Sequence, residues 1–120
     1  MPTDHRRRFG AAGEEAAADW YRAAGYDVLD RNWRCREGEL DIVARRDRVI
    51  VFCEVKARRS DAFGAPVEAM TATKQARIHG LALRWLAARA VRTRDLRFDV
   101  ASVRPAARGG LTVEVLEGAF

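Results

Sequence analysis

Four charged side chains in the middle of the chain have the types and the spacing of a metal-assisted hydrolytic site. Glu39 and Asp41 are two residues apart in one apolar segment, and Glu54 and Lys56 are two residues apart in the next. Because side chains alternate between the faces of a strand, each pair should lie on one face. Carboxylates placed in this way can hold a hard cation such as Mg²⁺, and a neighbouring lysine can orient water or stabilise charge on a phosphate.

The segments that carry these residues are expected to form a β-hairpin. Residues 39–45 alternate in hydropathy, and residues 48–56 begin with a nearly continuous apolar run, which predicts two strands. With Arg46 and Asp47 as a two-residue turn, Glu39 would lie opposite Glu54, with Asp41 one diagonal step away. Three carboxylates would then converge. Since like charges that face each other on a sheet repel, a cation would be needed to neutralise them.

A simpler explanation is that these residues form a surface ion-pair network at the end of an ordinary hairpin. The use of lysine favours chemistry instead. Of the 22 Lys and Arg residues, only Lys56 and Lys74 are lysines. A compact ammonium and a planar guanidinium are not interchangeable in a tight site of metal and water.

The remaining pattern predicts one α/β domain over residues 1–120 with the element order αβββαββ. A mixed central sheet should be flanked by helices, because no repeat and no second domain is visible. Residues 1–9 are expected to be a flexible extension, and Pro66 could begin a short helix. The predicted helices cover residues 10–24 and 72–90, and the strands outside the hairpin cover residues 26–32, 96–103 and 111–116.

Positive charge is concentrated in one part of the chain. The formal net charge is +5, yet residues 69–94 contain no acidic residue and six basic ones. A solvated helix face would explain such a segment, but a stretch of one sign without compensating carboxylates favours phosphate binding. The residues expected to contact a nucleic-acid backbone are Arg58, Arg59, Lys74, Arg77 and Arg84.

Other residues that could carry chemistry have ordinary explanations. Cys35 and Cys53 are too few for a disulfide framework or a four-ligand zinc site, so they should be buried or idle thiols. Neither histidine has a partner at metal-ligand spacing. Trp33 could equally be core or stack on a base. The residues assigned to the surface or the core are His5, His79, Trp20 and Trp85.

No apolar run is long enough to span a bilayer. The Arg6-Arg7-Arg8 cluster is not followed by the apolar core of a signal peptide. The protein is therefore expected to be cytoplasmic and to have no membrane partner.

Asp41 is followed after twelve residues by Glu54-Val55-Lys56. This spacing resembles the PD-(D/E)-x-K signature of restriction-endonuclease-like nucleases, with Leu40 in place of the proline. A longer set of motifs, in order over nearly the whole chain, resembles the YraN-like family of small bacterial proteins. These motifs are Gly13-Glu14, Gly25-Tyr26, Asn32-Trp33-Arg34, Gly38-Glu39-Leu40-Asp41, Phe52-Cys53-Glu54-Val55-Lys56, Phe63-Gly64, Lys74 and Arg97-Phe98-Asp99-Val100.

The resemblance implies a restriction-endonuclease-like fold related to archaeal Holliday-junction resolvases. It implies that Asp41 and Glu54 bind Mg²⁺ or Mn²⁺, that the Val55 carbonyl is a third ligand and that Lys56 positions water. The glutamate that this pattern places on the first helix falls on Glu14, with the adjacent Glu15 as the alternative.

Two functions of different classes follow. The first is a metal-dependent endonuclease that hydrolyses phosphodiester bonds in branched or structured nucleic acid, with DNA favoured over RNA. The second is a non-catalytic module for nucleic-acid binding or assembly on the same scaffold. The intact acidic and lysine positions favour the first, because a pure binder gains nothing from carboxylates that face a polyanion. Junction-cutting enzymes of the resembled class act as dimers, so a homodimer through an exposed edge strand is a further expectation.

Overall fold

The computed structural model describes residues 2–59, 70–93 and 95–120. In these ranges the element order αβββαββ is confirmed, and Pro66 and Phe63-Gly64 lie outside them. The elements are α1 (Pro2–Ala23), β1 (Asp27–Cys35), β2 (Gly38–Arg46), β3 (Val49–Ala57), α2 (Ala72–Ala88), β4 (Asp95–Pro105) and β5 (Leu111–Leu116).

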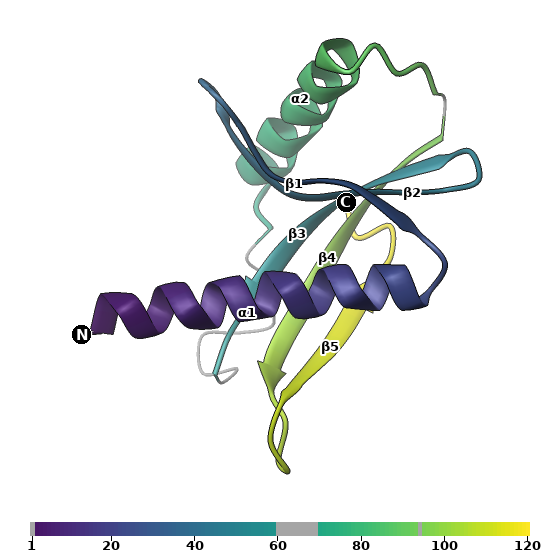
Figure 1. The fold of residues 1–120 in the computed structure, drawn as a ribbon. Helices are drawn as coiled ribbons and strands as arrows, with labels where there is room; N and C mark the ends of the chain where they lie inside the picture. Colours follow the sequence, from purple (N-terminus) through teal and green to yellow (C-terminus); the bar gives the residue numbers. More distant parts are fainter. Residues whose placement is uncertain (1, 60–69, 94) are drawn as a thin grey trace.

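The strands form one mixed sheet in the order β1-β2-β3-β4-β5. Neighbouring strands are antiparallel except β3 and β4, which are parallel and are joined through α2. The continuous apolar run of β3 suits this central position, because a strand covered on both faces needs apolar side chains on both. The sheet is strongly twisted, so that β1 and β2 cross the molecule at a steep angle to β3, β4 and β5 (Figure 1).

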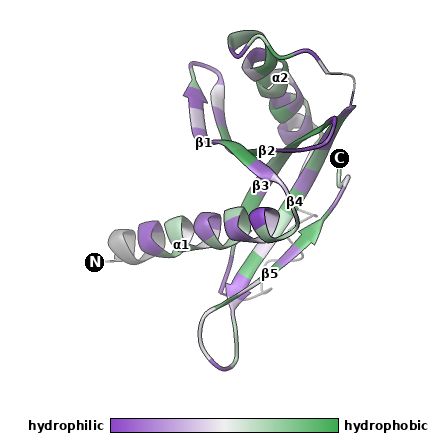
Figure 2. Ribbon diagram, turned by 45° about the vertical axis from the view of Figure 1, so that its right-hand side comes forward, coloured by the Kyte–Doolittle hydropathy of each residue, from purple (hydrophilic) through white to green (hydrophobic). Residues whose placement is uncertain are grey.

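The two helices pack on opposite sides of the sheet and define two apolar cores. The α1-side core contains Ala17, Ala18 and Tyr21 of α1 with Val51 and Cys53 of β3. Its partner, the α2-side core, is formed around Ile78, Leu81, Ala82 and Trp85 of α2, with Ile50 and Phe52 of β3. Both helices carry hydrophobic and hydrophilic residues along their length, as Figure 2 shows, and the helix residues named above are the ones that are buried against the sheet. The fold is the single α/β domain with a mixed sheet and flanking helices that the sequence predicts.

The predicted position of the hairpin turn is wrong by one residue. Arg46 pairs with Val49, so the turn residues are Asp47 and Arg48. Asp47 has φ +55, a left-handed backbone conformation that aspartate tolerates better than most residues. Arg46 therefore stays on β2, where its guanidinium donates to the Ala24 carbonyl and lies over the Tyr26 ring.

This shift changes the strand register that the sequence analysis used. Ile42 pairs with Cys53, so continuing the register brings Asp41 toward Glu54. The expected placement of Glu39 directly opposite Glu54 is wrong.

Two element boundaries differ from the predicted ones by more than two residues. Helix α1 begins at Pro2 rather than at residue 10, which is compatible with proline because the first turn of a helix needs no backbone donor. Strand β1 continues past Asn32 to Cys35. Within this strand Asn32 has φ +51, a conformation in which asparagine is enriched.

Helix α1 lies close to β3 at Gly13. A Cβ atom on Gly13 would lie 2.8 Å from the Cβ of Ala57. We expect Gly13→Ala to lower the free energy of unfolding by about 1–3 kcal/mol, because the helix would have to move away from the strand. Gly10→Ala in the same helix is the matched control, since its new Cβ would meet nothing within 4 Å. Urea denaturation of both variants tests this, and equal effects would contradict the close approach.

Candidate active site

The candidate site forms where β2 separates from β3. The paired register of these strands ends at Ile42 and Cys53. One residue further, the Asp41 carboxylate accepts a hydrogen bond of 2.8 Å from the Val55 amide. The side chain of Asp41 thus satisfies a β3 donor that would otherwise bond to a strand carbonyl.

The alternation of β2 is interrupted at the same place. Leu40 and Val43 both belong to the α2-side core, whereas Ile42 belongs to the α1-side core. With strict alternation, residues 40 and 43 would lie on opposite faces. The change of face between Leu40 and Ile42 falls on either side of Asp41, whose carboxylate reaches the Val55 amide. The assignment of side chains to sheet faces by simple alternation, which the sequence analysis used, is therefore not valid at this point of β2.

The Asp41 carboxyl is held in an environment that disfavours its charge. Burial is the main cause, followed by the negative charge of Glu54, and together they raise the pKa of Asp41 to about 7. Glu14 and Glu39 add smaller contributions of the same sign, and only the Val55 hydrogen bond opposes them. The other three predicted carboxylates therefore all contribute negative charge at Asp41.

Lys56 is the cation of this cluster. Its Nζ lies 3.4 Å from Glu54 Oε1, and the two side chains are 19% and 23% exposed. Within the described ranges no lysine or arginine pairs with Asp41. The charge near Asp41 is thus only partly compensated by protein groups, and a divalent cation would favour its ionised form.

The contacts of Glu14 and Glu15 differ. Glu15 pairs with Arg31 and with Arg22, and the Arg31 hydrogen bond lowers the pKa of Glu15. Glu14 instead contributes to the electrostatic field at Asp41. The electrostatics thus favour Glu14 over Glu15 as the helix glutamate that acts on the cluster. Glu39 also has a cationic partner, because Arg34 Nε lies 3.5 Å from its carboxylate.

A metal ion here would depend on few protein ligands. Among the described residues, no three side chains from His, Cys, Asp and Glu are close enough to form a ready-made metal site. Mg²⁺ is commonly bound by one or two carboxylates with water and substrate phosphate as the other ligands. The oxygen donors of Asp41 and Glu54 fit that chemistry, and the Val55 carbonyl is the backbone group beside them.

The residues predicted to contact phosphate lie after β3 and on α2. The Arg58 amide donates to the Val103 carbonyl, and the exposed Arg59 has its guanidinium over the Phe9 ring. Lys74 is in the first turn of α2, which Thr71 caps. Arg77 is exposed. Arg84 forms an exposed ion pair with Glu37 of the β1–β2 turn.

The ordinary explanations for the aromatic, histidine and cysteine residues are consistent with their positions. Trp85 is buried and donates to Asp30, while Trp20 and Trp33 are half-buried against the α1-side and α2-side cores. His79 is exposed and lies against Phe98 and Phe120. The side chain of His5 lies outside the described part of the structure. Cys53 is buried, Cys35 is half-buried, and both are free thiols.

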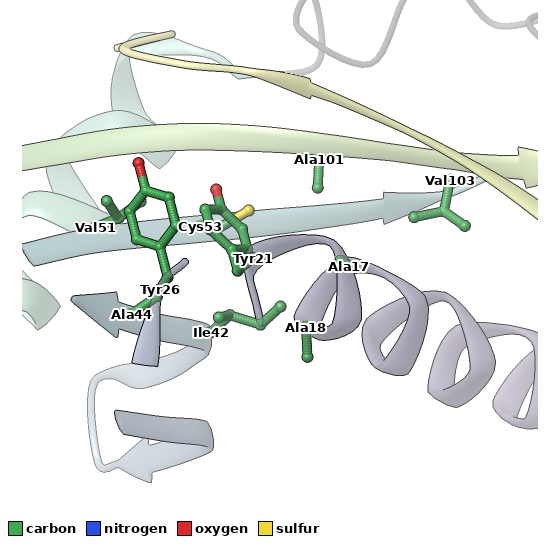
Figure 3. Close-up of a cluster of buried hydrophobic side chains, with 10 residues drawn as sticks. All are labelled: Ala17, Ala18, Tyr21, Tyr26, Ile42, Ala44, Val51, Cys53, Ala101 and Val103. Carbon is green, nitrogen blue, oxygen red and sulfur yellow. The ribbon is translucent and has the colours of Figure 1, made fainter. Parts of the chain in front are cut away.

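The sequence analysis missed a buried polar network on β4. Asp99 is fully buried, and its carboxylate accepts hydrogen bonds from Tyr21 at 2.6 Å, from Arg97 at 2.9 and 3.0 Å and from the Gly118 amide at 3.0 Å. Arg97 also donates to the Tyr26 hydroxyl. Figure 3 shows the hydroxyls of Tyr21 and Tyr26 pointing the same way. The network holds the end of α1, the helix that carries Glu14, against β4.

The arrangement of this domain and its order of elements define its class: a single α/β domain with a five-stranded mixed sheet and two helices, consistent with a nuclease-like fold, with acidic residues at the point where two central strands separate. The chain belongs to the family described as "Uncharacterised protein family UPF0102", whose model matches residues 13–103. This confirms the resemblance to the YraN-like family.

Relatives of known sequence cover nearly the full chain. The UPF0102 protein of Beutenbergia cavernae is 50% identical over 109 residues, which are 91% of this chain and 92% of the relative. That of Frankia alni is 50% identical over 111 residues, or 92% of each chain. The UPF0102 protein of Myxococcus xanthus is 47% identical over 116 residues, 96% of this chain and 90% of its own length.

None of the helices in the described part of the chain is long and apolar enough to cross a membrane.

Proposed function

We propose that this protein is a metal-dependent endonuclease that hydrolyses phosphodiester bonds in branched or structured nucleic acid. The observation that carries the proposal is the position of Asp41, Glu54 and Lys56 where β2 and β3 separate, with the Val55 amide fixing the Asp41 carboxylate. DNA is the favoured substrate, the cytoplasm the expected location and a homodimer through an edge strand, β1 or β5, the expected assembly.

In this proposal Asp41 and Glu54 hold Mg²⁺ or Mn²⁺, with the Val55 carbonyl as a third donor. The metal, when bound, supplies a Lewis acid that lowers the pKa of water and offsets charge on the phosphate. Lys56 orients the attacking water or stabilises the developing charge. Glu14 and Glu39 add negative charge around the pair, and the basic residues after β3 and on α2 bind the backbone.

The second function is a binding or assembly module without turnover. The observation that favours it is that no trio of ligating side chains is assembled among the described residues. Such a module would bind nucleic acid through its arginines and would have no need to take up a divalent cation.

Calorimetric titration with Mn²⁺ tests the proposal. We expect the wild type to bind Mn²⁺ and both Asp41→Asn and Glu54→Gln to bind at least ~10-fold more weakly, because each removes an anionic ligand from a site with few ligands. Glu114→Gln is the matched control, since Glu114 is an exposed carboxylate on β5.

Cleavage of a labelled branched DNA separates the two functions. The endonuclease should cut it only with Mg²⁺ or Mn²⁺, and Glu54→Gln should bind without cutting. Absence of Mn²⁺ uptake by the wild type, with DNA binding retained, would reject the endonuclease in favour of the module.

A further inference from the structure

A pocket of about 400 Å³ lies at the other end of the β2–β3 hairpin from the acidic cluster. It is lined by Arg45, Arg48, Arg92, Thr93 and Asp95. These residues come from the end of β2, the hairpin turn, the connection after α2 and the start of β4, which meet on one side of the molecule (Figure 1). The three arginines are all exposed, so the pocket is open to solvent.

Hydrogen bonds fix the walls of this arginine pocket. The Thr93 hydroxyl donates to the Arg48 carbonyl at 2.9 Å and accepts from the Asp95 amide at 3.2 Å. Asp95 in turn pairs with Val49 across the parallel strands. The connection after α2 is thereby attached to the hairpin turn, and the pocket is a defined part of the fold.

The charge of the pocket is not balanced by the protein. Within the described ranges, no carboxylate forms an ion pair with Arg45, Arg48 or Arg92, and the Arg45 guanidinium donates to the Asp47 carbonyl at 3.0 Å. By contrast, Arg22, Arg31, Arg89 and Arg97 all pair with carboxylates. Three guanidiniums around one pocket, with Asp95 as the only lining carboxylate, favour an anion there, and their forked geometry suits phosphate.

The position of the pocket favours a nucleic-acid strand as the source of that phosphate. Arg48 and Glu54 are six residues apart along the hairpin, which corresponds to ~20 Å at the rise of a strand. A duplex that follows β3 would present phosphates at both places, about six base pairs apart. The strand could thus be held at the arginine pocket while another of its phosphates reaches the acidic cluster.

We propose that the arginine pocket binds a backbone phosphate of the nucleic acid on which the acidic cluster acts. The choice of nucleic acid rests on the proposed function, whereas the choice of phosphate rests on the pocket itself. Arg45 and Arg48 lie outside the basic segment 69–94 of the sequence analysis, and Arg92 lies within it but is not among the five residues expected there to contact the backbone.

Titration with inorganic phosphate, followed by amide NMR, tests the pocket. We expect saturable shifts of the Arg48, Thr93 and Asp95 amides in the wild type, with sodium chloride at equal ionic strength as control. Arg48→Gln and Arg92→Gln should each weaken them. Absence of shifts in the wild type would overturn the proposal. Glu54→Gln should keep these shifts even though it loses Mn²⁺, so failure of the metal site and failure of the pocket are distinguishable.

Fluorescence anisotropy on a labelled DNA duplex at several salt concentrations tests the source of the phosphate. Arg48→Gln should flatten the slope of log affinity against log salt by about 0.9, the contribution of one phosphate contact. Arg108→Gln is the matched control, because Arg108 is also an exposed arginine between two strands, and it should leave the slope unchanged. Equal slopes for both variants would overturn the assignment to a strand and leave a small phosphorylated compound as the ligand.

Discussion

Without divalent cations, the free energy of unfolding should fall as the pH rises from about 4 to about 7, and Asp41→Asn should remove most of this fall. The pKa of Asp41 is about 7 in the folded protein against an ordinary value of 3.8. Between these values the unfolded chain has lost the proton that the folded protein keeps, so a rising pH favours unfolding. At 1.36 kcal/mol per pKa unit, the effect is on the order of 2–4 kcal/mol.

Urea denaturation from pH 4 to pH 8 in the presence of a chelator measures this effect. Asp41→Asn keeps the size of the side chain but cannot ionise, so its stability should exceed that of the wild type above pH 7. Glu114→Gln, on the exposed side of β5, should follow the wild-type curve. If the free energies of unfolding of wild type and Asp41→Asn change with pH in the same way over this range, the aspartate does not lie in the partly buried, negatively charged environment described above.

Asp99→Ala should destabilise the protein by about 3–5 kcal/mol. Removal of the carboxylate leaves the Tyr21 hydroxyl and the Gly118 amide without their acceptor, and it leaves Arg97 without its main counter-charge. Loss of one partner from a buried ionic network costs more than the network contributes as a whole, because the remaining polar groups stay buried. Burial also raises the pKa of Tyr21, so its hydroxyl stays a donor at neutral pH.

Tyr21→Phe is the milder variant in this network. It removes a single hydrogen bond and should cost about 1–2 kcal/mol. Thermal and urea denaturation of both variants give the comparison even if Asp99→Ala folds poorly. A loss below 1 kcal/mol for Asp99→Ala would show that water or Glu117, which lies 3.6 Å from Arg97, replaces the aspartate.

The elements of this fold were predictable where a single physical signal dominates. The continuous apolar run of β3 is typical of a strand that is buried on both faces, and the apolar stripe of α2 is typical of a helix that is buried on one face. Both elements were therefore predicted. The order of elements and the mixed sheet followed from them. The start of α1 was not predicted, because the basic residues before Gly10 carry no apolar period.

The geometry of the site was less predictable because it depends on local backbone exceptions. Asp47 and Asn32 both have positive φ, and nothing in the neighbouring residues distinguishes them from other polar positions. Because the predicted turn was one residue too early, the predicted pairing of β2 with β3 was shifted, and Glu39 was wrongly placed opposite Glu54. Asp99 was missed for a different reason: an arginine and an aspartate two residues apart on a strand are typical of an exposed ion pair, and Asp99 is buried only in the folded chain, where Tyr21 of α1 and Gly118 contact its carboxylate.

The parallel pairing of β3 with β4 sets the order in which the parts of this protein can assemble. The two strands are joined through the whole of α2, and closing so long a loop costs entropy before the new contacts can compensate for it. The contact between Asp41 and Val55 lies inside one hairpin and can form early. The arginine pocket needs the start of β4 against the hairpin turn, so we expect its walls to come together later than the contact between Asp41 and Val55.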